Sequence, residues 1–194
     1  MGQIKLVITD LDGTLFNTLE ANKASYKAAA EYLGLEWNDE LYEKNFGLNW
    51  KDMTKALGVP EDKAKELHDR KAVEYVEHFD LIKVNFDLLD FLFYMKEQET
   101  KICIATTAAT ENVVNLLNYF ELYDEFDFII TADNIKGLRG KPYPDIYFEA
   151  LKAAGGITPD EAIVFEDSEV GMEAAKAAGI NYIKIDMTKI YKDE

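Results

Sequence analysis

Four short polar segments each follow an apolar run that is typical of a buried β-strand. In chain order they are residues 10–14 (DLDGT), 106–107 (TT), 140–142 (GKP) and 166–168 (EDS). Carboxylates, hydroxyls and an ammonium group together are suited to holding an anion beside a metal cation. Because ligands of open parallel sheets bind beyond the carboxyl ends of the strands, we expect these segments to meet in one site.

The first segment places two aspartates, Asp10 and Asp12, two residues apart. If the extended backbone of the preceding strand continues through both, their side chains start on the same face. Gly13 then allows a sharp turn that brings backbone N–H groups towards whatever the carboxylates face. Two close carboxylates repel, which leaves one of them protonated unless a cation lies between them. Ordinary turn chemistry also explains this pattern, and that alternative stays open.

The second and third segments supply donors. Thr106 and Thr107 offer hydroxyl groups and helix-start N–H groups to an anion, although an N-cap explains the pair equally well. Lys141 lies between Gly140 and Pro142 on a constrained loop, where its cation is able to neutralise a phosphoryl oxygen. A solvated surface charge is the alternative for a lone lysine.

The fourth segment supplies carboxylates. Glu166 and Asp167 continue from a buried run, where acidic groups tend to be paired or metal-bound, although acidic residues also favour a helix start. Cys103 lies in an apolar run and is predicted to be inert, and packing or surface roles are favoured for His68 and His78. These three residues cannot form a zinc cluster, so any metal is held by carboxylates, which favours Mg²⁺.

The elements that must position these segments alternate along most of the chain. Strands are expected at 4–8, 101–105, 126–131, 162–165 and 182–185, and helices at 88–98, 111–119, 144–154 and 170–178. Such alternation predicts an α/β fold with a Rossmann-like parallel sheet covered on both faces. Residues 19–78 have only helical patterns. We therefore predict a core of residues 1–16 and 85–194, and an inserted all-helical cap domain of residues 17–84.

Composition excludes several classes of protein. The 194 residues are 48% hydrophobic and 12% aromatic, which is typical of a chain that folds around a core. The net charge of −16 repels phosphate backbones and anionic lipid, so we expect neither nucleic acid nor membrane as a partner. No apolar stretch is long enough to span a membrane, and the N-terminus lacks the features of a signal peptide. We expect a cytoplasmic protein.

Taken together, the four segments resemble the motifs of the haloacid dehalogenase-like (HAD-like) superfamily of phosphatases. The similarity is to the subgroup with a helical cap after the first strand, which includes phosphoglycolate phosphatase and β-phosphoglucomutase. The matching motifs are residues 10–15 (DLDGTL), Thr106, Gly140 to Pro142 with Pro144 and Asp145, and residues 165–168 (FEDS) with Gly171.

The resemblance implies a phosphomonoester hydrolase (phosphatase) that acts on a small phosphorylated metabolite. Asp10 would be the nucleophile and would form an aspartyl-phosphate intermediate. Asp12 would protonate the leaving oxygen and then deprotonate the attacking water. Asp10, the backbone carbonyl of Asp12, Glu166 and Asp167 would hold the Mg²⁺ ion.

The resemblance also implies which residues recognise the substrate. Thr106, Thr107 and Lys141 would hold the oxygens of the transferring phosphoryl group. In the predicted cap, Trp50 and Lys51 are candidate specificity residues, since a cap loop is able to place them over the site.

Three departures from the family pattern, and two residues that are kept, bear on the alternative functions. This chain has Asn17 where the first motif often has an aspartate. It has Asn22 and Trp50 where β-phosphoglucomutase has a histidine and an arginine, which disfavours the alternative of a phosphosugar mutase or phosphotransferase. A catalytically silent binding protein on this scaffold would be expected to lack Asp10 or Asp167, and both are present.

Overall fold

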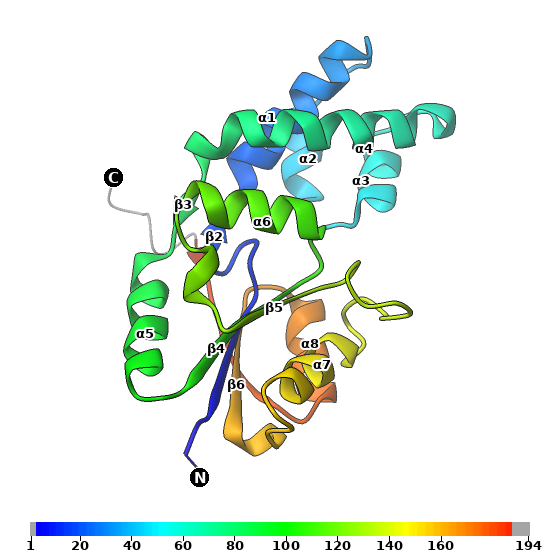
Figure 1. Cartoon of the computed structure of the whole chain (residues 1–194). Coiled ribbons are helices and arrows are strands. Elements are labelled where there is room, and N and C mark those ends of the chain that lie inside the picture. Colours follow the sequence, from blue (N-terminus) through cyan, green and yellow to red (C-terminus); the bar gives the residue numbers. More distant parts are fainter. Residues whose placement is uncertain (1–2, 188–194) are drawn as a thin grey trace. The chain divides into compact units, whose positions relative to one another are not determined.

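The computed structural model describes residues 3–187, which form two compact units. Of the described residues, the core unit comprises 3–17 and 84–187, and the helical unit comprises 18–83 (Figure 1). The boundaries expected from the sequence, at 16/17 and 84/85, each differ from these by one residue. The helical unit is therefore an insertion directly after the first polar segment.

The core unit contains a five-stranded sheet in the order β5-β4-β1-β6-β7, and every pair of neighbours is parallel. The strands are β1 (Leu6–Thr9), β4 (Lys101–Thr106), β5 (Phe128–Thr131), β6 (Ala162–Glu166) and β7 (Asn181–Lys184). The predicted α/β parallel-sheet class is confirmed. Strand β1 is central and all four of its residues are buried, as expected for an apolar run covered on both faces.

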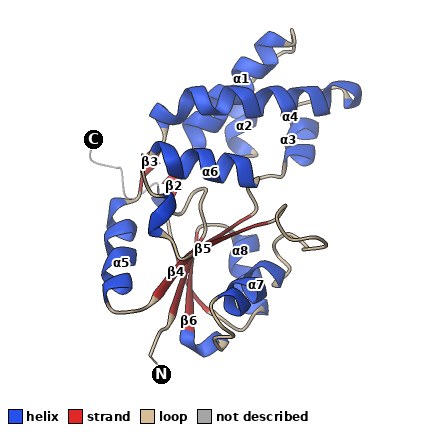
Figure 2. Ribbon diagram, in the orientation of Figure 1, coloured by secondary structure: helices blue, strands red, loops and turns tan. Residues whose placement is uncertain are grey.

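Helices cover both faces of this sheet. Figure 2 shows α5 (Phe86–Glu97) on one side of the strands, and α7 (Asp145–Ala153) and α8 (Glu169–Ala177) on the other. Alternate β1 residues Leu6 and Ile8 pack in one cluster with residues of α7 and α8. Helix α6 (Thr110–Tyr119) follows β4, with the short 3-10 helices η2 (Tyr123–Glu125) and η3 (Pro159–Glu161) completing the core unit.

The start of α5 lies two residues earlier than predicted. The side chain of Asn85 accepts a hydrogen bond from the backbone N–H of Leu88 at 3.1 Å and is the N-cap, whereas a helix beginning at Leu88 would be capped by Asp87. The Asn85 amide also donates to the backbone carbonyl of Thr14 at 3.1 Å. This cap therefore ties α5 to the first polar segment.

The helical unit is built around aromatic packing. It contains α1 (Leu19–Tyr32), α2 (Asp39–Lys44), α3 (Trp50–Ala56), α4 (Glu61–Tyr75) and the 3-10 helix η1 (Val76–Leu81). Its buried cluster includes Tyr26, Ala29, Tyr42, Met53 and Leu67. Two short strands, β2 (Phe16–Asn17) and β3 (Lys83–Val84), pair with each other where the chain enters and leaves this unit. Among the described residues, no helix has both the length and the apolar composition to cross a membrane.

Candidate active site

The two aspartates of the first segment lie beyond the end of β1. The strand ends at Thr9, so the premise that extended geometry continues through Asp10 and Asp12 is wrong. Asp10 is instead fixed by its backbone N–H, which donates to the carbonyl of Phe165 in β6 at 3.0 Å. Asp12 lies in a turn and forms an isolated bridge with Phe16. The Asp10 side chain is buried, while Asp12 is half-buried.

Gly13 has the two properties that a side chain would prevent. Its φ of 85° lies in the left-handed region, and its N–H donates to the carbonyl of Phe16 at 2.7 Å to close the turn. A Cβ atom at this position would overlap the carboxylate of Asp167. That carboxylate accepts a hydrogen bond from the Thr14 hydroxyl at 3.2 Å. The turn thus brings the first and fourth segments into contact.

Lys141 connects the third segment to the other two. Its ammonium lies 2.6 Å from Oδ1 of Asp10 and forms a second ion pair with Oε1 of Glu166. A third contact, at 3.3 Å, is to the backbone carbonyl of Ala105. The Lys141 side chain is only 5% exposed, so it is not the solvated charge considered as the alternative. Its three N–H donors all have acceptors.

Glu166 is completely buried and accepts four hydrogen bonds. Lys141 and the hydroxyl of Tyr147, at 3.1 Å, both contact Oε1. The backbone N–H of Ser168 at 3.1 Å and its hydroxyl at 3.0 Å both contact Oε2. A Cβ at Gly171 would overlap this carboxylate, which explains the glycine at the start of α8. The alternative, that Glu166 and Asp167 only favour the start of a helix, does not explain the position of Glu166, because the N-cap of α8 is Ser168.

Burial and crowding perturb the ionisation of these groups. Burial raises the pKa of Asp10 well above its usual range, against the lowering effect of Lys141. Burial and the charge of Glu166 raise the pKa of Asp167 to about 6. Burial alone would lower the pKa of Lys141, but Asp10, Tyr147 and Glu166 hold it well above its ordinary value. The site therefore carries one permanent cation among several carboxyl groups.

This charge distribution fits a divalent cation. Asp10, Glu166 and Asp167 each offer a carboxylate oxygen, and these atoms lie within 4.8 Å of one another. Burial is the largest cause of the raised pKa values of Asp10 and Asp167, and a bound cation would favour the charged forms of both. The donors are oxygen atoms, as hard cations prefer. Since Glu166 already accepts four hydrogen bonds, Asp10 and Asp167 are the freer of the three.

The two threonines of the second segment lie in different environments. Thr106 is buried at the end of β4, and its hydroxyl accepts from the N–H of Ala108 at 3.1 Å, whereas Thr107 is exposed. The N-cap alternative for this pair is wrong, because α6 starts later, at Thr110. The carboxylate of Asp133 instead accepts from the N–H and hydroxyl of Thr110.

The helical unit holds the remaining candidates. Trp50 starts α3 and stacks on His68 with ring centroids 4.6 Å apart. The Lys51 ammonium lies 5.5 Å from the centre of the Trp50 ring. The side-chain amide of Asn22 donates to the Thr18 carbonyl, and an amide cannot act as an acid or base. The roles of Trp50 and Lys51 in specificity stay predictions.

Two residues contact the predicted carboxylates without any sign of this in the sequence. Thr14 belongs to the first motif, and only the structure shows its hydrogen bond to Asp167. Tyr147 lies in a predicted helix, and no local pattern indicates that its hydroxyl contacts Glu166. Cys103 is buried with a raised pKa due to burial, in keeping with its predicted inertness.

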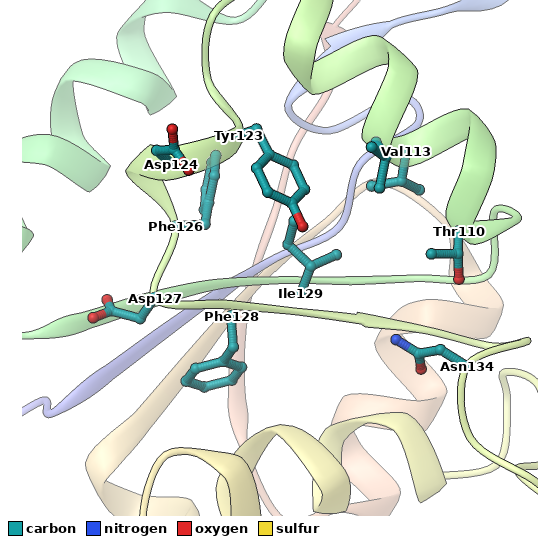
Figure 3. A pocket seen from close by; sticks show the side chains of 10 residues that line it. Thr110, Val113, Tyr123, Asp124, Phe126, Asp127, Phe128, Ile129 and Asn134 are labelled. Carbon is teal, nitrogen blue, oxygen red and sulfur yellow. The ribbon is translucent and has the colours of Figure 1, made fainter.

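A separate pocket of about 340 Å³ lies in the core unit (Figure 3). Side chains from α6, η2 and β5 line it, including Val113, Tyr123, Asp124 and Ile129. None of the predicted site residues lines this pocket. The predicted chemistry therefore depends on the cluster at the end of β1, not on this cavity.

Comparison with known proteins gives consistent matches over most of the chain. The family model described as haloacid dehalogenase-like hydrolase matches residues 7–185. A phosphorylated carbohydrates phosphatase of Thermotoga maritima is 30% identical over 187 residues, covering 93% of this chain and 84% of the relative. The β-phosphoglucomutase of Bacillus subtilis is 28% identical over 189 residues, covering 91% and 81%.

Solved structures give the same picture. The crystal structure of CbbY from Rhodobacter sphaeroides in complex with phosphate has a TM-score of 0.80 and 26% sequence identity. The alignment covers 94% of this chain and 86% of that chain. The agreement extends through the sheet and the inserted helices, so the resemblance inferred from the four motifs is confirmed.

Proposed function

Because the chain belongs to the haloacid dehalogenase-like hydrolase family, and is therefore a hydrolase, we propose that it removes phosphate from a small phosphorylated metabolite in an Mg²⁺-dependent reaction. The observation that carries this proposal is the buried contact of 2.6 Å between Lys141 and Asp10 beside Asp167. It combines a carboxylate nucleophile, a phosphate-binding cation and a place for a metal in one cluster. A cytoplasmic location stays a prediction.

The reaction proceeds in two displacements. A carboxylate oxygen of Asp10 forms a bond to phosphorus while the bond from phosphorus to the leaving oxygen breaks, and Asp12 gives that oxygen a proton. Asp12 then accepts a proton from water as the water oxygen attacks phosphorus. The bond between phosphorus and Asp10 breaks, which releases inorganic phosphate and restores both aspartates.

The other residues of the cluster bind and orient. Lys141 and the donors of Thr106 and the exposed Thr107 hold phosphoryl oxygens as negative charge develops on them. Asp10, the Asp12 carbonyl and Asp167 would hold Mg²⁺, with Glu166 beside them. When bound, Mg²⁺ screens the negative charge of the substrate from that of the nucleophile.

Sugar phosphates are the first substrates to test. One similar relative is named a phosphorylated carbohydrates phosphatase and another a fructose-1-phosphate phosphatase. Mutase activity is disfavoured, since Asn22 supplies no acid or base at the position where β-phosphoglucomutase has a histidine.

The test is a colorimetric assay of phosphate release from a panel of phosphorylated metabolites, with sugar phosphates and a phosphoprotein included. We expect turnover of small monophosphates with Mg²⁺, loss of turnover with a chelator and recovery on adding Mg²⁺. Asp167→Ala should raise the half-saturating Mg²⁺ concentration at least about tenfold. An unchanged Mg²⁺ requirement in this variant would place the metal elsewhere.

A control separates this effect from a general loss of acidic charge. Asp127→Asn alters a carboxyl group at the other end of the sheet, where it accepts a hydrogen bond from the Ile102 N–H. This variant should keep the wild-type Mg²⁺ response. A wild-type protein without activity on any phosphomonoester would contradict the proposed function.

A further inference from the structure

Tyr147 is buried and contacts the same carboxylate oxygen as Lys141, Oε1 of Glu166. It lies in the first turns of α7 with no exposed surface, and its hydroxyl lies 3.1 Å from Oε1 of Glu166. An ionised carboxylate only accepts hydrogen bonds, so the Tyr147 hydroxyl is the donor. A buried tyrosine needs a partner for its hydroxyl, and here that partner is a carboxylate of the site.

Glu166 and Asp10 share one ammonium group. The Lys141 Nζ contacts Oε1 of Glu166 on one side and Oδ1 of Asp10 on the other. The position of Nζ between them depends on how strongly each carboxylate attracts it. A second donor on Oε1 reduces that attraction, because the same oxygen charge is divided between the phenol and the ammonium.

We propose that Tyr147 is a positioning residue that acts through Glu166 to hold the Lys141 ammonium towards Asp10 and the phosphoryl oxygens. Without the phenol hydroxyl, Glu166 binds the ammonium more strongly and draws it away from the reacting atoms. Small displacements of a charge-stabilising group weaken the transition state more than the bound substrate. The catalytic part of this inference rests on the proposed phosphatase function.

Tyr147→Phe tests the inference with little change in packing, because the ring that lies 5.5 Å from the Lys141 ammonium is kept. We expect kcat to fall about tenfold while KM changes less than about threefold, as is usual for residues that orient a catalytic group. The matched control is Tyr42→Phe, which removes the hydroxyl of another buried tyrosine, in the helical unit. It should leave both constants unchanged, and thermal unfolding should show both variants folded.

A double-mutant cycle tests whether Tyr147 acts through Glu166. In a Glu166→Gln background the carboxylate charge is absent, so adding Tyr147→Phe should change kcat less than about twofold. A purely structural role for Tyr147 predicts the same decrease in both backgrounds. Additive effects, or a Tyr147→Phe variant with wild-type kcat, would overturn the inference.

The resonance of the Lys141 ammonium in ¹H–¹⁵N NMR gives a readout that needs no turnover. It is assigned by its loss in Lys141→Arg. Tyr147→Phe should shift it in the wild-type background and leave it nearly unchanged in the Glu166→Gln background. If this pattern holds in a protein without phosphatase activity, the proposed function fails and the coupling of Tyr147 to Lys141 stands. If the resonance does not shift, the coupling fails whatever the activity.

Discussion

The core unit and the helical unit each bury a lysine, and they surround its charge differently. In the core unit, Lys141 lies between the carboxylates of Asp10 and Glu166. In the helical unit, the ammonium of Lys71 lies 4.0 Å from the ring centre of Tyr75 and 5.6 Å from that of Tyr26. Lys71 is 8% exposed, so both lysines are largely removed from water.

The difference shows what each unit is suited to do. Carboxylates around a buried cation also give reactive oxygens and a place for a metal, at the cost of raised pKa values for Asp10 and Asp167. The aromatic rings beside Lys71 give packing and cation–π contacts. We therefore expect substitutions around Lys141 to affect chemistry, and substitutions around Lys71 to affect stability and specificity.

Asp10→Asn should give the largest effect. An amide cannot form the covalent intermediate, so turnover should fall by several orders of magnitude while the protein stays folded. Steady-state phosphate release and circular dichroism measure the two properties. Activity above about a tenth of wild type, in protein free of other phosphatases, would show that the nucleophile lies elsewhere.

Replacing each buried lysine by methionine compares the two units directly. Lys141→Met leaves Asp10 and Glu166 without their cation and should lower the free energy of unfolding by about 3–5 kcal/mol, with loss of turnover. Lys71→Met keeps an apolar side chain among the rings and loses the cation–π contacts, and we expect turnover of an aryl phosphate within about threefold of wild type. Urea unfolding measures the loss of stability in Lys141→Met, and steady-state phosphate release measures turnover of both variants. Equal losses of turnover in the two variants would break the comparison.

Trp50→Ala should give a smaller and more selective effect. We expect it to change the ratio of kcat/KM between two sugar phosphates several-fold, with little change for a generic aryl phosphate, since specificity is predicted to depend on the helical unit. Lys51→Ala should act in the same direction. The control is Trp37→Ala in the same unit, where the indole donates to Asp39. Equal effects of Trp50→Ala on every substrate would contradict a role in specificity.

The smallest expected effect comes from a carboxylate at the surface of the core unit. Hydrogen bonds from the Lys5 side chain and then from Thr158 lower the pKa of Glu161 from 4.5 to about 2. Because this pKa is lower in the folded state, the stabilisation is complete above about pH 4.5 and is lost as the pH falls towards 2.

Thermal unfolding across this pH range tests the Glu161 contribution. Glu161→Gln should lower the melting temperature slightly at pH 7, and the difference from wild type should disappear near pH 2. A difference that grows as the pH falls would have the wrong sign.

The polar segments could be predicted from the sequence, because residue type and strand periodicity are local properties. Asp10, Lys141 and Glu166 come together from three separate segments. This is expected, because the carboxyl ends of all strands in a parallel sheet lie at the same edge of that sheet. The hydrogen-bond partners within the cluster could not be predicted. They depend on which face of α7 packs inward, and that is decided by side chains of β1 and α8.

Local signals also failed where two choices were equally good. Asn85 and Asp87 are both favourable N-caps, and only the structure shows that Asn85 also binds the Thr14 carbonyl. The cap of α6 comes from Asp133, 23 residues away from Thr110, so no local pattern at Thr106 indicated it. By contrast, β1 ends at Thr9, one residue beyond the strand expected at residues 4–8.

The central place of β1 determines the order in which the chain is able to fold. Leu6 of β1 pairs with Lys101 of β4 on one side and with Ala162 of β6 on the other. In the sequence, the helical unit lies between β1 and β4. During synthesis, the helical unit is complete before either neighbour of β1 exists, and it is able to form from contacts close in sequence. The first strand must wait, unpaired, until most of the chain has left the ribosome. Closing the sheet around β1 is therefore the late, long-range step that also brings Asp10, Lys141 and Glu166 together.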